Sequence, residues 1–217
     1  MARTPVVEEH LTTGSISLDL EKVGLTQDQF FQLCSDNRDF RFELTAQKEL
    51  NIMPLPGPDT SWRNAIITAE LTNWARKDGT GITFDCACRF ILPNGASRGP
   101  DAAWLKRERW DALTPEQKRK GAPLCPEFLV ELMSPSDTLA EQKEMSGANA
   151  SPIGRSHQEK MKEYVANGLH LGWLIDPYNK TAYVYRSGAP PQILKNPSTL
   201  SGDPVLTGFR FNVTEIW

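Results

Sequence analysis

Two carboxylates in this sequence stand at positions where an ionised group needs an explanation. Glu131 lies in the middle of FLVELM (128–133), whose apolar density is typical of a strand covered on both faces. A carboxylate buried there costs free energy unless a metal ion, a cation or hydrogen bonds compensate its charge. Asp101 follows Pro100 at the start of another expected strand. Because carboxylates on neighbouring strands can chelate Mg²⁺, the pair predicts a site for metal-assisted attack on a phosphodiester.

Both carboxylates also have a structural interpretation. Glu131 could form a structural ion pair, or it could stand at the exposed end of its strand. Pro-Asp is a common turn dipeptide, so Pro100-Asp101 does not by itself indicate a metal. The local sequence leaves these alternatives open.

A lysine is the third candidate group. Lys160 and Tyr164 are four residues apart on the expected helix SHQEKMKEYVANG and therefore share one face of it. Met161 and Val165 give this helix an apolar side, so Lys160 would border the core. An ammonium there could hold the attacking water or stabilise the pentavalent phosphate, because positive charge is most effective where negative charge develops. The alternative is a solvated lysine on a charged helix.

Helices and strands that would position these residues follow from periodicity and from capping residues. Thr26 is a predicted N-cap for TQDQFFQLCSDN, and Thr114-Pro115 predicts the start of a short helix. A long helix ends at Asp78-Gly79, with helical spacing of Ala65, Ile66, Ala69 and Leu71. Expected strands are FRFELT, KELNIMP, ITFDCACRFILP, PDAAWL, FLVELM, LGWLIDP and TAYVYR, followed by a Pro-rich loop and a terminal segment around VLTGFRFNV.

The order of these elements predicts an α/β fold. Helices alternate with strands, and the closing strands are hairpin-connected, which favours a mixed sheet with helices packed against it. In FRFELT (40–45), the alternation of Phe40, Phe42 and Leu44 predicts a half-buried strand with KELNIMP as its hairpin partner.

Length and composition predict one globular domain. The 217 residues are 39% hydrophobic and 24% charged, which fits one core with decorations. We expect an N-terminal arm (1–24), a single domain (25–217) and a mobile insertion (137–156). No window could span a bilayer and the start lacks a secretory signal, so a cytoplasmic location is expected. The four cysteines lack metal or redox spacing and are expected to be reduced, mostly buried thiols.

Charge distribution leaves nucleic-acid binding open. The net charge of −3 argues against a uniformly basic coat, although a local basic groove remains compatible with it. Six basic residues after Asp101 outnumber three interspersed acids, and they could contact phosphates or form a solvated face: Lys106, Arg107, Arg109, Lys118, Arg119 and Lys120. Trp104 and Trp110 are expected to pack against the core rather than stack on bases. No phosphate-binding GxxxxGK[ST] loop, GxGxxG loop or zinc-binding histidine spacing is present.

Several blocks together resemble the PD-(D/E)XK nuclease superfamily, in particular the bacterial "putative restriction endonuclease" family labelled Uma-two. The blocks occur in order over roughly residues 40–186: FELTAQKELNIMP, WRNAI, FILPNGASRGPDAAWLKRERWDALTPEQ, CPEFLVELMSPSDT and QEKMKEYVANGLHLGWLIDP. This resemblance implies a restriction-endonuclease-like fold with a mixed central sheet flanked by helices. It also implies a DNA substrate, a Mg²⁺ cofactor that Mn²⁺ could replace, and, by analogy, a homodimer.

The resemblance also assigns roles to residues. Asp101 and Glu131 would bind the cation, with the backbone carbonyl of Leu132 as a further ligand. The superfamily lysine usually lies two residues after the acid, where this chain has Met133, so Lys160 becomes the candidate with Gln158 as its neighbour. If Lys160 pointed to solvent, Lys143 or Lys162 would have to be considered instead.

Two departures from the family pattern bear on catalysis. Related sequences often carry an acid on the long helix near the position of Ile66, whereas the nearest carboxylate here is Glu70, one turn further along. Either Glu70 substitutes for that acid or the site lacks this ligand. The insertion before QEKM is also longer than expected. The sequence therefore predicts a Mg²⁺-dependent endonuclease, with an inactive nuclease-fold protein acting in DNA binding or as a structural module as the alternative.

Overall fold

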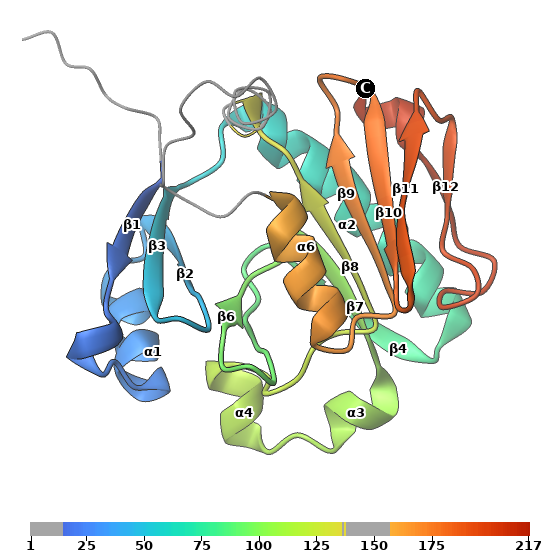
Figure 1. The fold of residues 1–217 in the computed structure, drawn as a ribbon. Coiled ribbons are helices and arrows are strands. Elements are labelled where there is room, and N and C mark those ends of the chain that lie inside the picture. Colours follow the sequence, from blue (N-terminus) through green and yellow to red (C-terminus); the bar gives the residue numbers. More distant parts are fainter. Residues whose placement is uncertain (1–14, 136, 138–156) are drawn as a thin grey trace, which may run out of the picture.

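A mixed sheet carries the candidate site in the computed structural model, which describes residues 15–135, 137 and 157–217. Its strand order is β11-β10-β9-β8-β7-β4, and only β8 and β9 run parallel among these neighbours (Figure 1). The strands are β4 (Gly81–Asp85), β7 (Ala102–Lys106), β8 (Phe128–Leu132), β9 (Leu171–Asp176), β10 (Thr181–Arg186) and β11 (Ala189–Lys195). The α/β class with a mixed central sheet is confirmed.

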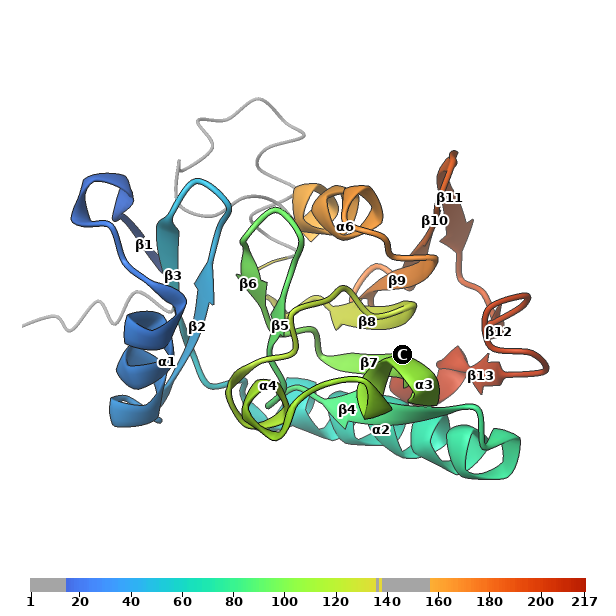
Figure 2. The same ribbon diagram turned by 90° about the horizontal axis from the view of Figure 1, so that it is seen from below.

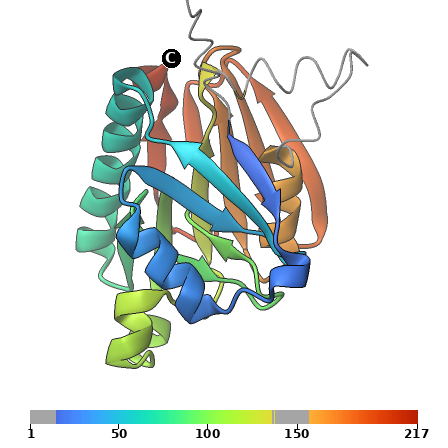
Figure 3. The same cartoon turned by 90° about the vertical axis from the view of Figure 1, so that its left-hand side faces the viewer.

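A second, smaller sheet lies beside the first one. Its order is β1-β3-β2-β6-β5, and α1 (Gln27–Asp36) packs against its apolar face (Figure 3). The strands are β1 (Ile16–Asp19), β2 (Phe40–Leu44), β3 (Glu49–Pro54), β5 (Phe90–Ile91) and β6 (Ser97–Arg98). A two-stranded sheet of β12 (Thr199–Ser201) and β13 (Arg210–Asn212) accompanies the C-terminal turn η2 (Val213–Ile216).

Two helices cover opposite faces of the six-stranded sheet. Figure 2 shows α2 (Pro58–Asp78) along one face and α6 (His157–Ala166) along the other. The short helices α3 (Arg107–Asp111) and α4 (Pro115–Lys120) follow β7, and η1 (Glu21–Val23) precedes α1. Within the described residues, none of the helices combines the length and hydropathy that a membrane crossing requires.

Alternation along β8 determines which way its carboxylate points. Phe128, Val130 and Leu132 belong to the core cluster that includes buried residues of α2. Leu129 belongs to the other cluster, with Met161 of α6. Because successive side chains of a strand point to opposite faces, Glu131 shares the face of Leu129 and lies toward α6. The expected strand with both faces covered is thus present, and its acid faces the helix that carries Lys160.

Expected helix ends occur where the capping residues predicted them. Thr26 and Thr114 each form a capping box with the glutamine three residues later. The long helix ends at Gly79, whose φ of 76° is favourable for glycine. The buried stripe of α2 includes Leu71, as expected, but otherwise runs through Asn64 and Ile67 and not through the expected Ala65, Ile66 and Ala69.

Two segments expected to lack pairing form strands at sheet edges. The Pro-rich segment after TAYVYR is β11, paired antiparallel with β10. Its prolines lie on the outermost strand of the sheet, where a missing amide donor is tolerated. Part of the expected arm is β1, paired with β3, while residues 1–14 lie outside the described residues. The expected insertion also lies outside the described residues, except for Asp137.

Replacing Leu71 with alanine should lower the free energy of unfolding by about 2–5 kcal/mol, because this fully buried side chain fills the core between α2 and the sheet. Urea denaturation followed by circular dichroism measures the change. The matched control is Leu55→Ala, whose side chain is 59% exposed and whose effect should stay within about 0.5 kcal/mol. Equal losses in both variants would contradict the assigned packing.

Candidate metal centre

Asp101 stands immediately before β7 and is held by donors on both carboxylate oxygens. Its Oδ2 accepts the backbone amide of Leu132 at 2.9 Å. Its Oδ1 accepts hydrogen bonds from Arg41 Nη1 and Asn64 Nδ2, each at 3.2 Å. The residue is 6% exposed, and its own amide donates to the carbonyl of Val130 at 3.0 Å. These contacts fix the carboxylate of Asp101 at the end of β8 that carries Glu131.

Glu131 is buried against α6 and shares one oxygen between two donors. Lys160 Nζ lies 2.9 Å from Glu131 Oε1, and the hydroxyl of Tyr164 donates to the same oxygen at 3.0 Å. Lys160 and Tyr164 reach Glu131 together because they are one helical turn apart on α6. The structural ion pair considered from the sequence is therefore present. Burial of Glu131 alone does not require a metal, so the case for one rests on Asp101 beside it.

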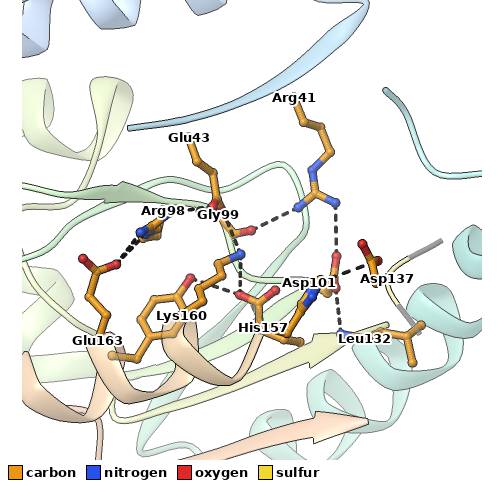
Figure 4. Close-up of polar contacts among 12 residues, drawn as sticks. Arg41, Glu43, Arg98, Gly99, Asp101, Leu132, Asp137, His157, Lys160 and Glu163 are labelled. Carbon is orange, nitrogen blue, oxygen red and sulfur yellow. Dashed lines mark hydrogen bonds and ion pairs between the residues drawn. The ribbon is translucent and has the colours of Figure 1, made fainter. Parts of the chain in front are cut away.

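The ammonium of Lys160 bridges two carboxylates. Its Nζ lies 2.7 Å from Glu43 Oε1 in addition to its contact with Glu131, and its side chain is only 12% exposed (Figure 4). The site contact expected for Lys160 is therefore present, whereas the alternative of a solvated lysine is wrong. Since β2 supplies Glu43 and β8 supplies Glu131, Lys160 joins the two sheets at the candidate site.

A chain of alternating charges extends away from Lys160. Arg98 Nη1 lies 3.0 Å from Glu43 Oε2, and Arg98 Nε donates to Glu163 Oε2 at 2.7 Å. The amide of Gly99 donates to Glu43 Oε1 at 3.1 Å. Figure 4 shows this series running from Glu163 on α6 through β6 and β2 back to Lys160 on α6. Each buried charge therefore has an opposite charge beside it.

The two carboxylates that share Lys160 have opposite pKa shifts. Burial works to raise the pKa of Glu43, but Lys160 and Arg98 outweigh it and lower the pKa to about 2. Burial raises the pKa of Glu131, and Lys160 offsets this only in part because Asp101 and Glu43 add negative charge nearby. Burial also acts to lower the pKa of Lys160, but Glu131 and Glu43 together raise it, so the amine stays protonated.

Arg41 places a guanidinium beside Asp101. Its Nη2 donates to the carbonyl of Gly99 at 3.0 Å, while Nη1 pairs with Asp101. Burial acts to lower the pKa of Arg41, and the carboxylates of Asp101, Glu43 and Glu131 outweigh that effect and raise it. One quarter of the Arg41 side chain is exposed.

Among the other expected site residues that the structure describes, only Leu132 contacts this group. Glu70 is exposed on α2, and the helix residue that contacts Asp101 is Asn64. Gln158 is half-buried on the first turn of α6, and within the described residues we find no hydrogen bond from its side chain. Lys162 is exposed, and Lys143 lies outside the described residues. Leu132 contributes its backbone amide to Asp101.

Sequence reasoning missed Glu43, Arg41 and Asn64. The alternation in FRFELT predicts one buried and one solvated face, but Glu43 is 4% exposed and Phe40 is 51% exposed. The polar face of β2 is buried because it faces α6 and the six-stranded sheet. A usable signal is the segment FELT, in which the polar residues Glu43 and Thr45 alternate with the core residues Phe42 and Leu44.

The basic stretch lies at the other end of β7 from Asp101. Asp101 precedes the first residue of β7 and Lys106 is the last, which separates them by roughly 17 Å at strand geometry. Arg109 pairs with Glu127, and Lys120 pairs with Asp28 and Glu116. Trp104 is buried in the core, as expected, and Trp110 packs at its edge beneath Lys118. Much of this charge is thus engaged within the protein.

All four cysteines are free, but the expectation that they are mostly buried holds only for Cys125. Cys34, Cys86 and Cys88 are half-buried. Among the described residues, no group of three or more His, Cys, Asp or Glu side chains is arranged to hold a metal ion. A cation at this site would therefore depend on two carboxylates supplemented by neutral oxygens and waters.

Comparisons with known proteins agree with this architecture. The sequence model of a family named Uma2 and described as "Putative restriction endonuclease" matches residues 27–214. A crystal structure from Anabaena variabilis, described as "a putative nuclease", has a TM-score of 0.65 and 18% sequence identity to the chain. The alignment covers 88% of this chain and 97% of that one, so the two share a fold. No curated protein matches the sequence.

Replacing Glu43 with glutamine should remove a pH-dependent part of the stability. The pKa of Glu43 falls from its ordinary value of 4.5 to about 2 on folding, which corresponds to about 3–4 kcal/mol at about 1.4 kcal/mol per pKa unit. A lowered folded pKa stabilises the protein above pH 4.5, and this contribution disappears as the pH falls toward 2.

Urea denaturation of the wild type and Glu43→Gln between pH 7 and pH 2 measures this contribution. The difference in unfolding free energy should be largest at neutral pH and narrow as the pH drops. Glu49→Gln on the neighbouring strand β3 is the matched control. A Glu43→Gln difference that does not change with pH would contradict the assigned ion pairs.

Proposed function

This chain belongs to the Uma2 family, described as "Putative restriction endonuclease", and on that premise we propose that it hydrolyses DNA phosphodiester bonds with bound Mg²⁺. The family match bears out the resemblance found in the sequence blocks. The observation that carries the proposal is the convergence of Asp101, Glu131 and Lys160 at adjacent ends of β7, β8 and α6. Mn²⁺ is expected to replace Mg²⁺ in the same position.

The residues present suit a hard divalent cation. Asp101 and Glu131 come from neighbouring strands, and Asp101 adds to the negative charge that raises the pKa of Glu131. Mg²⁺ prefers one or two carboxylates with waters and phosphate oxygens, which matches a site with few protein ligands. The N–H and C=O of one strand residue point toward the same neighbouring strand, so the Leu132 carbonyl lies on the side of Asp101 and is our candidate for a further ligand.

Lys160 acts in this proposal as a fixed positive charge. Bound Mg²⁺ would polarise the scissile phosphate and lower the pKa of a coordinated water. Because the two neighbouring carboxylates keep Lys160 protonated, its role is to orient the attacking water or stabilise the phosphate rather than to accept a proton. Tyr164 and Glu43 hold Glu131 and Lys160 in place through their hydrogen bonds. Arg41, which pairs with Asp101 in the cation-free protein, is our candidate for a contact to a backbone phosphate.

Two further parts of the proposal concern assembly and location. A homodimer would place two sites on one duplex and allow both strands to be cut, and it is proposed by analogy with restriction endonucleases. Sedimentation velocity of the purified protein tests it, with a monomer at micromolar concentration as the contradicting result. A cytoplasmic location, where DNA is accessible, remains a prediction.

Plasmid cleavage in Mg²⁺ or Mn²⁺ tests the proposed reaction. Asp101→Asn, Glu131→Gln and Lys160→Met should each reduce the cleavage rate by about 100-fold or more, because each removes a charge from the site where the phosphate reacts. Conversion of supercoiled plasmid to nicked and linear forms on gels, with EDTA as a blank, measures the rate.

Glu70→Gln is the matched control, because Glu70 is an exposed acid of α2 outside the group. It should cleave at the wild-type rate. If all variants cleaved the plasmid at the wild-type rate, the assignment of Asp101, Glu131 and Lys160 to the active site would be contradicted. If the wild type fails to cleave but binds DNA, the alternative of an inactive nuclease-fold protein replaces the proposal.

A further inference from the structure

Two exposed aromatic rings contact the guanidinium of Arg63 at the start of α2. Trp62 is 50% exposed and Tyr178 is 38% exposed. The Cζ atom of Arg63 lies 5.5 Å from the centroid of the Trp62 ring and 5.4 Å from that of the Tyr178 ring. These three side chains form an aromatic patch, which differs from the single exposed apolar residues that are normal on a protein surface.

Hydrogen bonds fix one ring of the aromatic patch in place. Arg63 forms an ion pair with Asp59, and its Nε donates to the carbonyl of Ile216 at 2.7 Å. The hydroxyl of Tyr178 donates to Asp59 Oδ2 at 2.9 Å, and the amide of Tyr178 donates to Asp176 Oδ1 at 3.1 Å. The Tyr178 ring therefore has little conformational freedom to lose when a ligand stacks on it.

The aromatic patch lies beside the proposed metal centre. Trp62 is two residues before Asn64, whose Nδ2 donates to Asp101 Oδ1 at 3.2 Å. Tyr178 follows β9, and the end of β9 pairs with the end of β8. Figure 1 shows the start of α2, the end of β8 and the turn after β9 at one end of the six-stranded sheet. Nucleotides next to the cleaved bond, rather than the reacting phosphate itself, would reach the two rings.

The charge of the protein favours stacking over phosphate contacts as the source of affinity for DNA. A duplex is held largely through its phosphates, which requires many free cations. The chain has a net charge of −3, and Arg109 and Lys120 of the basic stretch are paired with carboxylates. Lys180 is exposed in the same turn as Tyr178 and supplies one positive charge there. Aromatic rings stack on any base whose face is free, a condition that unpaired nucleotides meet.

We propose that Trp62 and Tyr178 stack on unpaired bases, so that the DNA cut at this site is single-stranded beside the scissile phosphate. This inference rests on the proposed function for the identity of the ligand. Lys180 contacts the backbone next to these bases. Negative supercoiling favours strand separation, so the plasmid of the cleavage assay also presents unpaired bases.

The competing interpretation is that the two rings only attach α2 to the turn after β9. Trp62→Leu and Tyr178→Leu each remove a ring, whereas Trp62→Phe and Tyr178→Phe keep an aromatic face. Tyr178→Phe also deletes the hydrogen bond to Asp59. A structural role predicts that DNA affinity follows thermal stability across these variants. A stacking role predicts that affinity follows the ring and is retained in both phenylalanine variants, whatever their Tm.

Fluorescence anisotropy in EDTA measures the affinity for labelled oligothymidine and for a blunt duplex of equal length. The wild type should bind oligothymidine more tightly than the duplex. Each leucine variant should lose about 5-fold or more in affinity for oligothymidine, because stacking on one ring contributes at least that much. Its affinity for the duplex should not change.

Trp110→Leu is the matched control. The Trp110 ring forms a similar ring–cation pair, with Lys118 Nζ 5.0 Å from its centroid, but it lies on α3, which follows the far end of β7 from Asp101. This variant should bind oligothymidine as the wild type does.

The outcomes separate this inference from the proposed function. If the leucine variants bind oligothymidine like Trp110→Leu, or if the wild type binds the duplex at least as tightly as oligothymidine, the inference is overturned, and plasmid cleavage that depends on Asp101 still supports the proposed reaction. If binding follows the rings but the plasmid is not cleaved, the proposed reaction fails and the stacking surface stands. Because the rings belong to different elements and are tested separately, one leucine variant that fails to fold leaves the other to decide.

Discussion

Burial of the Glu131 carboxylate constrains the structure around it more than any other single feature. The acid is 2% exposed within a strand that is covered on both faces, and an unpaired charge there would cost several kcal/mol. Lys160 and Tyr164 compensate it from α6, and Asp101 stands at the neighbouring strand end. The packing of α6 on the sheet is therefore also an electrostatic arrangement, because its core residue Tyr164 provides a hydrogen bond to the acid.

The small sheet extends this arrangement. Glu43 on β2 forms a second ion pair with Lys160, and Arg98 on β6 forms an ion pair with Glu43. Each ion pair buries one more charged side chain, which needs an opposite charge in turn. The series ends at Glu163, which lies on α6 like Lys160. Removing one member leaves each of its neighbours with one opposite charge fewer, so the contributions of these residues to stability are coupled. The result is a buried network that holds Glu131 and Lys160 in place before any cation binds.

Much of the fold was predictable because its signals are local. Thr26, Thr114 and Gly79 specify helix ends through their own capping chemistry, and the apolar run around Glu131 identifies a doubly covered strand. Asp101, Glu131 and Lys160 could be named as site candidates from their residue types and positions, and the family resemblance favoured these roles over the structural alternatives. Glu43 and Asn64 could not, because their burial depends on which distant element covers β2 and α2. Period-two alternation identifies two faces of a strand, but it does not reveal that the polar face is also covered.

The central claim is that Asp101 and Glu131 together bind a divalent cation. Anomalous diffraction from crystals grown with Mn²⁺ tests it most directly, because the peak locates the ion without reference to activity. The account predicts one strong peak about 2.0–2.3 Å from a carboxylate oxygen of each residue, with Lys160 beside it. A map with no peak between the two carboxylates would contradict the account.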